Sequence, residues 1–367
     1  MGLLSAVVDR AVNRTALPGR LPASARATDL LRRAPVVDLL VGSALFRDSF
    51  VNGGRGHVDR PRLRAVGVNL VGLTVATRWP NRRGSLSGWH FRSLGMPAVT
   101  THGDMAMAEW LIGRIHGWCD QSGGELVVVR SRADVERCLA PDGPVGILIG
   151  IQGGHVLEGD LANLARLRAA GVRMFAPAHV MDNTLVGSGT GRRADGLSDF
   201  GREVIAELEA QSIVVDLAHM SLPGIAAALP LLRRPFALSH AGLTDIAGGR
   251  SRWSRFSPAT RNVPASLVSE VAAAGGLFGV ALSTQLLGGS SLAAAATTFR
   301  AALDAAGADH VAIGSDMDGA LSMLIDAEGL PALVDALLDS GIPETAVTAL
   351  IGGNAVALLR AALQLQQ

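Results

Sequence analysis

Four side chains that can accept or donate a proton stand directly after short apolar segments of this sequence. His179 follows VRMFAPA, His219 follows SIVVDLA, His240 follows PFALS and Asp316 follows HVAIGS. Imidazole and carboxylate groups serve as metal ligands and as general acids or bases. If the apolar segments are parallel strands of a barrel, their ends meet at one mouth, and the four side chains share a single site.

Eight apolar segments of this kind recur along the chain. They are rich in Val, Ile and Leu and apolar throughout, which is typical of strands buried on both faces. Amphipathic helical patterns separate them, so the sequence predicts a single (β/α)8 TIM barrel in preference to a doubly wound open sheet. We expect an N-terminal helical segment, 1–33, packed on a barrel domain, 34–367. The apolar segments are 36–40, 68–77, 145–151, 172–178, 212–218, 235–239, 276–283 and 310–315.

The composition of the chain limits which partners and which cellular location we expect for the protein. The net charge is +1, every basic residue is Arg, and aromatic residues make up 4% of the chain, so nothing indicates nucleic-acid binding. No apolar run approaches the roughly 18 residues that cross a bilayer. The first residues lack the long apolar stretch of a secretory signal. We therefore expect a cytoplasmic protein without a membrane partner, and the distant Cys119 and Cys138 predict no disulfide framework.

Two acidic residues are candidates for proton transfer at the last strand. Asp316 and Asp318 lie two residues apart in GSDMDG. Either could take a proton from a water or a substrate nitrogen, although Asp318 before Gly also fits a turn. Arg261 stands in the long loop after His240, where a guanidinium can hold a carboxylate by two hydrogen bonds. A surface arginine would have the same sequence signature.

Eight short blocks follow one another along the sequence: GIQGGH, AHVMDN, GLSDFGREVI, VDLAHMS, ALSHAG, RNVP, IGSDMDG and IGGNAVALL. Their order resembles that of the membrane (renal) dipeptidase family. The resemblance implies an amidohydrolase-type barrel, dipeptide hydrolysis by two bridged zinc ions, and commonly a homodimer. It assigns His219 and His240 to the second zinc and His179 to the substrate and the tetrahedral intermediate. It assigns Arg261 to the dipeptide carboxylate and Asp316 to proton transfer.

Several zinc ligands that the resemblance requires are missing. The family begins its barrel with Asp-Gly-His-Asn-Asp, whose His and final Asp bind the first zinc, but this chain places Leu40 and Gly42 there. The bridging Glu of the family's Glu-Gly-Gly is Gln152 here, a neutral amide. A dication beside Leu40 would be left largely unpaired, at a high cost in free energy. We predict no dinuclear zinc centre, and either no metal or one weakly held zinc ion at His219 and His240.

Three hypotheses about function are open from the sequence. The first is a dipeptidase-like enzyme that acts on an amino-acid- or peptide-like small molecule in specialised metabolism. It would use metal-free or single-metal acid–base chemistry, with imidazoles titrating near neutrality. Gln152, His179 and Arg261 would bind the substrate, for isomerisation, elimination, cyclisation or amide cleavage. The second is a genuine zinc dipeptidase or amide hydrolase with ligands from elsewhere, such as His57. The third is a non-catalytic binding protein.

The five tryptophans, two of them with a phenylalanine nearby in the sequence, fall into two groups. Trp110 and Trp118 have helical spacing and are predicted to lie in the core. The others follow strand ends, where they would either wall an apolar pocket or pack on the barrel rim. These are Trp79, Trp89, Phe91, Trp253 and Phe256.

Overall fold

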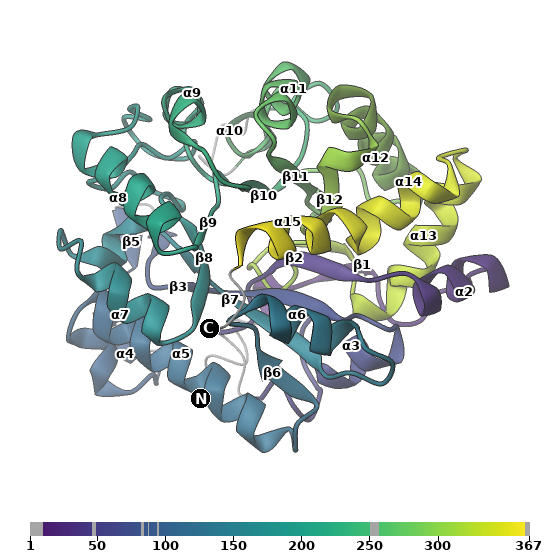
Figure 1. Ribbon diagram of the computed structural model, residues 1–367, viewed down its shortest axis with the longest axis horizontal. Coiled ribbons are helices and arrows are strands. Elements are labelled where there is room, and N and C mark those ends of the chain that lie inside the picture. The colour runs from purple at the N-terminus through teal and green to yellow at the C-terminus, as the bar shows by residue number, and fades with distance from the viewer. Residues whose placement is uncertain are drawn as a thin grey trace.

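Eight parallel strands form the centre of the molecule, and helices surround them (Figure 1). The structure is a computed structural model that describes residues 10–45, 49–81, 84–86, 88–93, 95–249 and 257–363. Each of the eight predicted apolar segments overlaps one strand, so the predicted (β/α)8 barrel is confirmed. The strands are β2 (Val37–Val41), β3 (Leu70–Ala76), β7 (Val145–Gln152), β8 (Val172–Ala176), β9 (Val214–Val215), β10 (Ala237–Ala241), β11 (Leu277–Val280) and β12 (Val311–Ile313).

Parallel pairing joins the strands in the order β10, β11, β12, β2, β3, β7, β8, β9. A bridge between Asp216, just after β9, and Ala237 in β10 joins the two ends of this order and closes the barrel. The register of β3 against β7 brings Ala76 beside Gln152. A further strand, β6 (Leu126–Val128), pairs with the first residues of β7. Because the eight strands run in one direction, their C-terminal ends form a single mouth.

The helices around the barrel begin at residues that cap them. Ser131, Ser198, Ser221 and Ser291 each accept a hydrogen bond from a backbone N–H in the first turn of the following helix. Such caps satisfy N–H groups that have no partner within the helix. The helices are α3 (Arg60–Ala65), α5 (Asp104–Gln121), α6 (Arg132–Leu139), α7 (Asn163–Ala169), α8 (Asp199–Ala210), α9 (Leu222–Ala228), α10 (Pro258–Arg261), α11 (Ala265–Ala273), α12 (Leu292–Ala306), α13 (Leu330–Asp339), α14 (Glu344–Thr348) and α15 (Asn354–Ala362).

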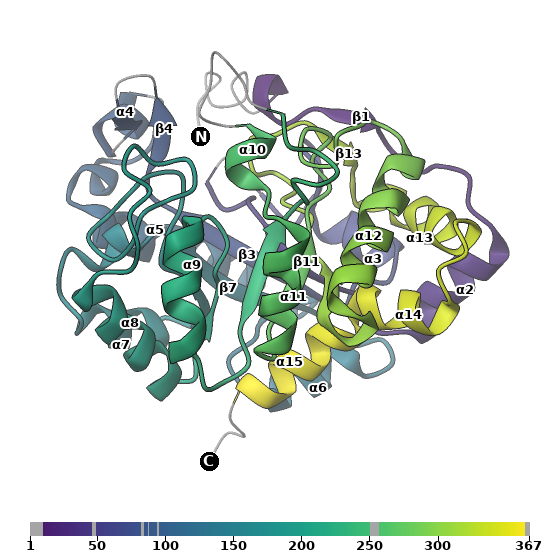
Figure 2. The same ribbon diagram turned by 90° about the horizontal axis from the view of Figure 1, so that it is seen from above.

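The barrel interior is apolar below the mouth. Leu70, Leu148 and Met174 share one buried cluster with Val356 of α15, the helix that crosses the opposite end of the barrel (Figures 1 and 2). The helical stretch Glu344–Ala362 is long and apolar enough to cross a membrane, yet 61% of its apolar 18-residue window is buried inside the fold. Its apolar surface therefore belongs to the core of this fold, which is the usual reason for a helix that is apolar on most sides.

The N-terminal segment contains a strand and a helix. Strand β1 (Thr15–Leu17) pairs with β13 (Met323–Ile325), which follows β12. Helix α2 (Ala25–Arg33) is capped by Ser24, which also bonds to Asp335 of α13. Residues 1–9 lie outside the described residues, and the domain boundary at residue 33 stays a prediction.

A long excursion separates β3 from α5. It contains a hairpin of β4 (Trp79–Asn81) and β5 (Gly84–Leu86), followed by α4 (Gly88–Ser93). Trp89 is 72% exposed, whereas Phe91 is buried, so these two do not wall a common pocket. Trp118 is buried and Trp110 packs against the core, as predicted. The side chain of Trp79 and the whole of Trp253 and Phe256 lie outside the described part of the chain.

Candidate active site

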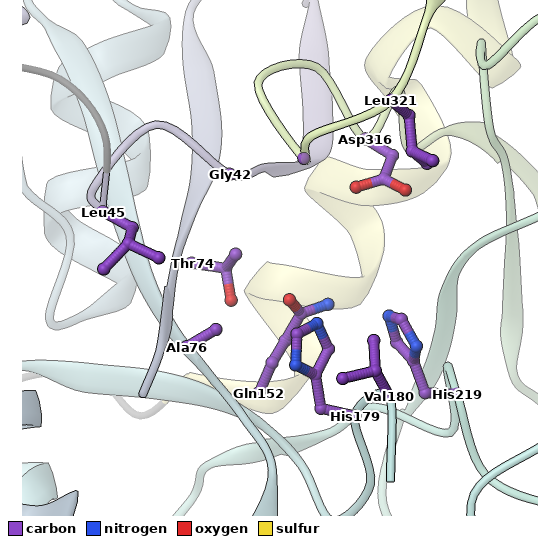
Figure 3. Close-up of a pocket in the computed structure, with 11 residues that line it drawn as sticks. Gly42, Leu45, Thr74, Ala76, Gln152, His179, Val180, His219, Asp316 and Leu321 are labelled. Carbon is purple, nitrogen blue, oxygen red and sulfur yellow. The ribbon is translucent and has the colours of Figure 1, made fainter. Parts of the chain in front are cut away.

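Side chains from four strand ends converge on a small cavity at the mouth. Gln152 ends β7, His179 and His219 follow β8 and β9, and Asp316 follows β12. The cavity has a volume of about 30 Å³, which is space for about two water molecules. Figure 3 shows Gln152, His179 and His219 rising from one side towards the carboxylate of Asp316 on the other. A cavity of this size has room for a small chemical group and not for a whole dipeptide.

His219 and His240 contact each other through their outer ring nitrogens. The two Nε2 atoms lie 3.0 Å apart, and the ring of His179 packs edge to face against that of His219. Ser239 links His240 to a buried carboxylate, because its hydroxyl donates to Asp216 at 2.6 Å and lies 2.7 Å from His240 Nδ1. With the hydroxyl proton directed at Asp216, Nδ1 of His240 must carry the proton shared with Ser239. Nε2 of His240 is then an acceptor, and His219 donates to it.

Gln152 directs a donor at the same acceptor. Its amide nitrogen lies 3.3 Å from Nε2 of His240, so the N–H shares with His219 the lone pair with which this imidazole would bind a metal. A carboxylate here would instead bring lone pairs and a negative charge. The position to which the resemblance assigns a bridging ligand is therefore a hydrogen-bond donor in this chain.

The imidazoles do not titrate near neutrality, contrary to the expectation from the sequence. Burial lowers the pKa of His179 to about 3. Burial, followed by the charge of Arg261, holds the pKa of His219 and of His240 well below the ordinary value. All three are consequently neutral at pH 7 and act as hydrogen-bonding groups.

Asp316, and not Asp318, is the acidic group that faces the cavity. Burial raises the pKa of Asp316 to about 7, an effect that the charge of Arg261 opposes. The carboxylate of Asp318 accepts hydrogen bonds from Ser43 Oγ at 2.5 Å and from the backbone N–H of His57 at 2.8 Å. Asp316 is therefore suited to proton transfer near neutral pH, whereas Asp318 anchors its loop.

Arg261 is a buried cation with few partners. Helix α10 ends at this residue, whose exposed fraction is 4%. One guanidinium nitrogen donates to the carbonyl of His240 at 3.4 Å, and Nε has no hydrogen-bond partner within the described residues. Burial lowers the pKa of Arg261, and the negative charges of Asp316 and Asp216 oppose this effect. A buried guanidinium with unused donors favours a bound carboxylate.

The end of β2 offers no ligand to a metal. Leu40 is 1% exposed and belongs to the apolar cluster that fills the barrel. The N–H of Gly42 donates to the carbonyl of Met317 at 2.7 Å. A Cβ atom on Gly42 would lie 2.9 Å from the carbonyl oxygen of Asp318. The backbone after β12 thus occupies the space that a ligand side chain at position 42 would need.

His57 does not supply the missing ligand. Its Nδ1 accepts from the backbone N–H of Asp318 at 3.0 Å, and its Nε2 donates to the carbonyl of Arg14 at 3.1 Å. Within the described ranges, no group of three or more His, Cys, Asp or Glu side chains could hold a metal ion. These donors do not fit two zinc ions, and His219 with His240 offers one ligand fewer than the three of a catalytic zinc site.

Sequence reasoning missed four polar residues of the site. Asp216 and Ser239 stand shortly before the two predicted histidines, and this proximity was the only available signal. Thr74 lines the cavity with a buried hydroxyl that has no hydrogen-bond partner among the described residues. His155, whose pKa burial lowers to about 4, bonds to Thr77 at 3.0 Å. The sequence of an apolar strand does not indicate whether a threonine within it, such as Thr74, faces a cavity.

Fold and site together define a barrel enzyme whose polar residues gather at the C-terminal ends of the strands. The sequence profile of the membrane dipeptidases (Peptidase family M19) matches residues 24–367, and the chain belongs to this family of hydrolases.

The chain is also similar to individual dipeptidases and a metallo peptidase. Dipeptidase aclJ of Aspergillus oryzae is 28% identical over 259 residues, which cover 68% of this chain but only 59% of that protein. The probable dipeptidase PvdM from Pseudomonas aeruginosa has a TM-score of 0.76 at 17% identity, covering 92% of this chain and 97% of that one. A metallo peptidase from Rhodobacter sphaeroides, liganded with a phosphinate mimic of the dipeptide L-Ala-D-Ala, has a TM-score of 0.73 at 23% identity, covering 90% and 99%. At these identities the two structures establish the shared fold.

Proposed function

We propose that this chain is an enzyme that acts on an amino-acid- or peptide-like small molecule with a free carboxylate. Its chemistry is proton transfer by Asp316 within a cluster of neutral imidazoles, without a dinuclear zinc centre. Membership of a dipeptidase family and the dipeptide mimic bound by one structural neighbour support the substrate class.

The observation that carries the proposal is the buried guanidinium of Arg261. It is 4% exposed and has an Nε without a partner among the described residues. Burying a charge without full hydrogen bonding costs several kcal/mol, on the order of the penalties measured for buried ions. A substrate carboxylate offsets that cost, because a guanidinium binds it through two parallel hydrogen bonds. Binding energy is therefore concentrated beside Asp316.

The other residues have complementary roles in this proposal. Asp316, with a pKa raised by burial to about 7, takes a proton from the substrate or a water and returns it. His179 contacts the reacting group. His219 and His240 each keep one tautomer, so their ring nitrogens act as a fixed donor and a fixed acceptor of hydrogen bonds. Gln152 contributes an amide near the substrate. Amide cleavage, isomerisation, elimination and cyclisation all use such proton transfers, and product analysis distinguishes them.

A matched pair of ligands tests the carboxylate site. Binding of L-Ala-D-Ala and of L-Ala-D-alaninamide, which lacks the carboxylate, is compared by calorimetry. We expect the acid to bind at least about 30-fold more tightly, in line with about 2 kcal/mol for a charge-assisted pair. Arg261→Met should abolish this preference. Arg202→Met, on the exposed face of α8, is the control and should keep it.

Metal content and turnover test the chemistry. We expect less than one equivalent of zinc by elemental analysis, product formation that a chelator does not abolish, and loss of turnover in Asp316→Asn with binding retained. Two equivalents of zinc with chelator-sensitive dipeptide cleavage would establish a zinc dipeptidase instead. Binding without any product, detected by mass spectrometry, would establish a binding protein.

Three further predictions concern the cellular setting. A homodimer, a cytoplasmic location and a role in specialised metabolism are proposed on the resemblance and the composition. Light scattering of the purified protein tests the first, since a monomer mass would contradict it.

A further inference from the structure

An N-terminal strap lies along the loop that carries Asp316. We define the strap as residues 13–24 and the Asp316 loop as residues 314–326. The backbone N–H of Ala320 donates to Asn13 Oδ1 at 2.9 Å, and the N–H of Met323 donates to the carbonyl of Arg14 at 2.7 Å. The pairing of β1 with β13 continues these contacts (Figure 2). Residues 13–17 of the strap are therefore bonded to residues 320–325 of the loop.

His57 ties the strap to the same loop from the other side. Its Nε2 donates to the carbonyl of Arg14, the same oxygen that accepts from the loop. Its Nδ1 accepts from the N–H of Asp318, while its own N–H donates to the carboxylate of Asp318. His57 and Asp318 are both at most 1% exposed. Hydrogen bonds in such a buried network are strong and costly to leave unmade.

The loop requires this support because its backbone is strained. Asp316, Asp318 and Ala320 have φ angles of 62°, 60° and 62°. The left-handed region costs roughly 1–2 kcal/mol for a residue with a Cβ atom, and alanine has no side chain with which to compensate. The carboxylate of Asp316 also lies so close to Gly319 that a Cβ atom there would be 2.1 Å from Oδ1. Any relaxation of the loop therefore moves Asp316.

We propose that the strap positions Asp316, through Asn13 and through the contact of Arg14 with His57. This inference rests on the proposed role of Asp316. The family profile matches from residue 24 onwards, so all of the strap except Ser24 lies before the region that the profile describes. The strap is a positioning element of the site, although none of its residues lines the cavity.

The test compares Asn13→Ala with Asn13→Asp and with Ser24→Ala. Asn13→Asp keeps an acceptor for the N–H of Ala320, and Ser24 bonds to α13 at the far end of the strap. Amide hydrogen exchange is measured for residues 316–322. The carboxyl carbon of Asp316, assigned with Asp316→Asn, is titrated by 13C NMR.

We expect exchange at 316–322 to accelerate at least about 10-fold in Asn13→Ala, as for loss of roughly one hydrogen bond. The titration midpoint of Asp316 should move towards that of a solvated aspartate. Asn13→Asp should restore slow exchange, and Ser24→Ala should change neither readout. Equal exchange in Asn13→Ala and wild type, or equal acceleration in Asn13→Ala and Ser24→Ala, would refute a specific role of the strap. Neither readout needs turnover, so full activity of Asp316→Asn would overturn the proposed function alone.

Discussion

The two sides of the barrel mouth differ in the residues that stand at their strand ends. Imidazoles stand after β8, after β9 and in β10, and the Nε2 atoms of His219 and His240 lie 3.0 Å apart. At the end of β2 stand Leu40, buried in the apolar cluster, and Gly42, bonded to the backbone after β12. One side thus presents nitrogen ligands, whereas the other is closed by hydrocarbon and peptide.

The β2 side differs by more than the absence of two ligand side chains, because the backbone of the following loop also fills the space that one of them would need. A Cβ atom on Gly42 would lie 2.9 Å both from the carbonyl oxygen of Asp318 and from the Cα of Gly319. The loop has occupied the space of the ligand, so restoring the residue type there does not restore the site. On the imidazole side, by contrast, only the amide of Gln152 stands where a ligand belongs.

Zinc affinity should respond to a single substitution on the imidazole side and not on the β2 side. Gln152→Glu supplies a third ligand beside His219 and His240, and we expect it to raise zinc affinity about 100-fold. Gly42→Asp should leave zinc affinity unchanged and should destabilise the protein by about 1–3 kcal/mol through overpacking. A zinc titration against a competing chelator measures the affinity.

Gln121→Glu, at the exposed end of α5, controls for the added charge. If Gln152→Glu binds zinc no better than this control, the amide is not what disfavours the metal. If Gly42→Asp gains affinity, the loop yields and the two sides are equivalent.

The barrel and the imidazole side could be predicted from the sequence because both obey local rules. Buried parallel strands read as apolar runs, and polar residues at their ends mark a mouth. The choice between Asp316 and Asp318 could not be predicted, because both have left-handed φ angles and do not continue the alternation of a strand. The closure over Gly42 depends on residues more than 270 positions away, which no local pattern reports.

The hydrogen-bond chain from His240 through Ser239 to Asp216 predicts that two buried serines respond differently to substitution by alanine. Loss of Ser239 should destabilise the protein, whereas loss of Ser283 should not. Ser239→Ala removes the donor to Asp216 and the acceptor for His240, so we expect a loss of about 2 kcal/mol in the free energy of unfolding. Ser283 is equally buried, after β11, but its hydroxyl has no partner within the described residues. Ser283→Ala should be neutral or slightly stabilising. Chemical denaturation of both variants decides, and equal losses would contradict the proposed chain.

Asp316 lies between the two sides, and its burial predicts a pH dependence of stability. Because its pKa rises from 3.8 to about 7 on folding, the folded state binds more protons than the unfolded state between these values. The stability of the wild type should therefore fall as pH rises through this window, and Asp316→Asn lacks this contribution. From pH 5 to pH 8 we expect the stability of the variant relative to wild type to increase by about 3 kcal/mol. Guanidinium denaturation across this range measures the difference, with the exposed Asp309→Asn as the control. A relative stability independent of pH would place the Asp316 carboxylate in contact with solvent, and its role in proton transfer near neutrality would lose its physical basis.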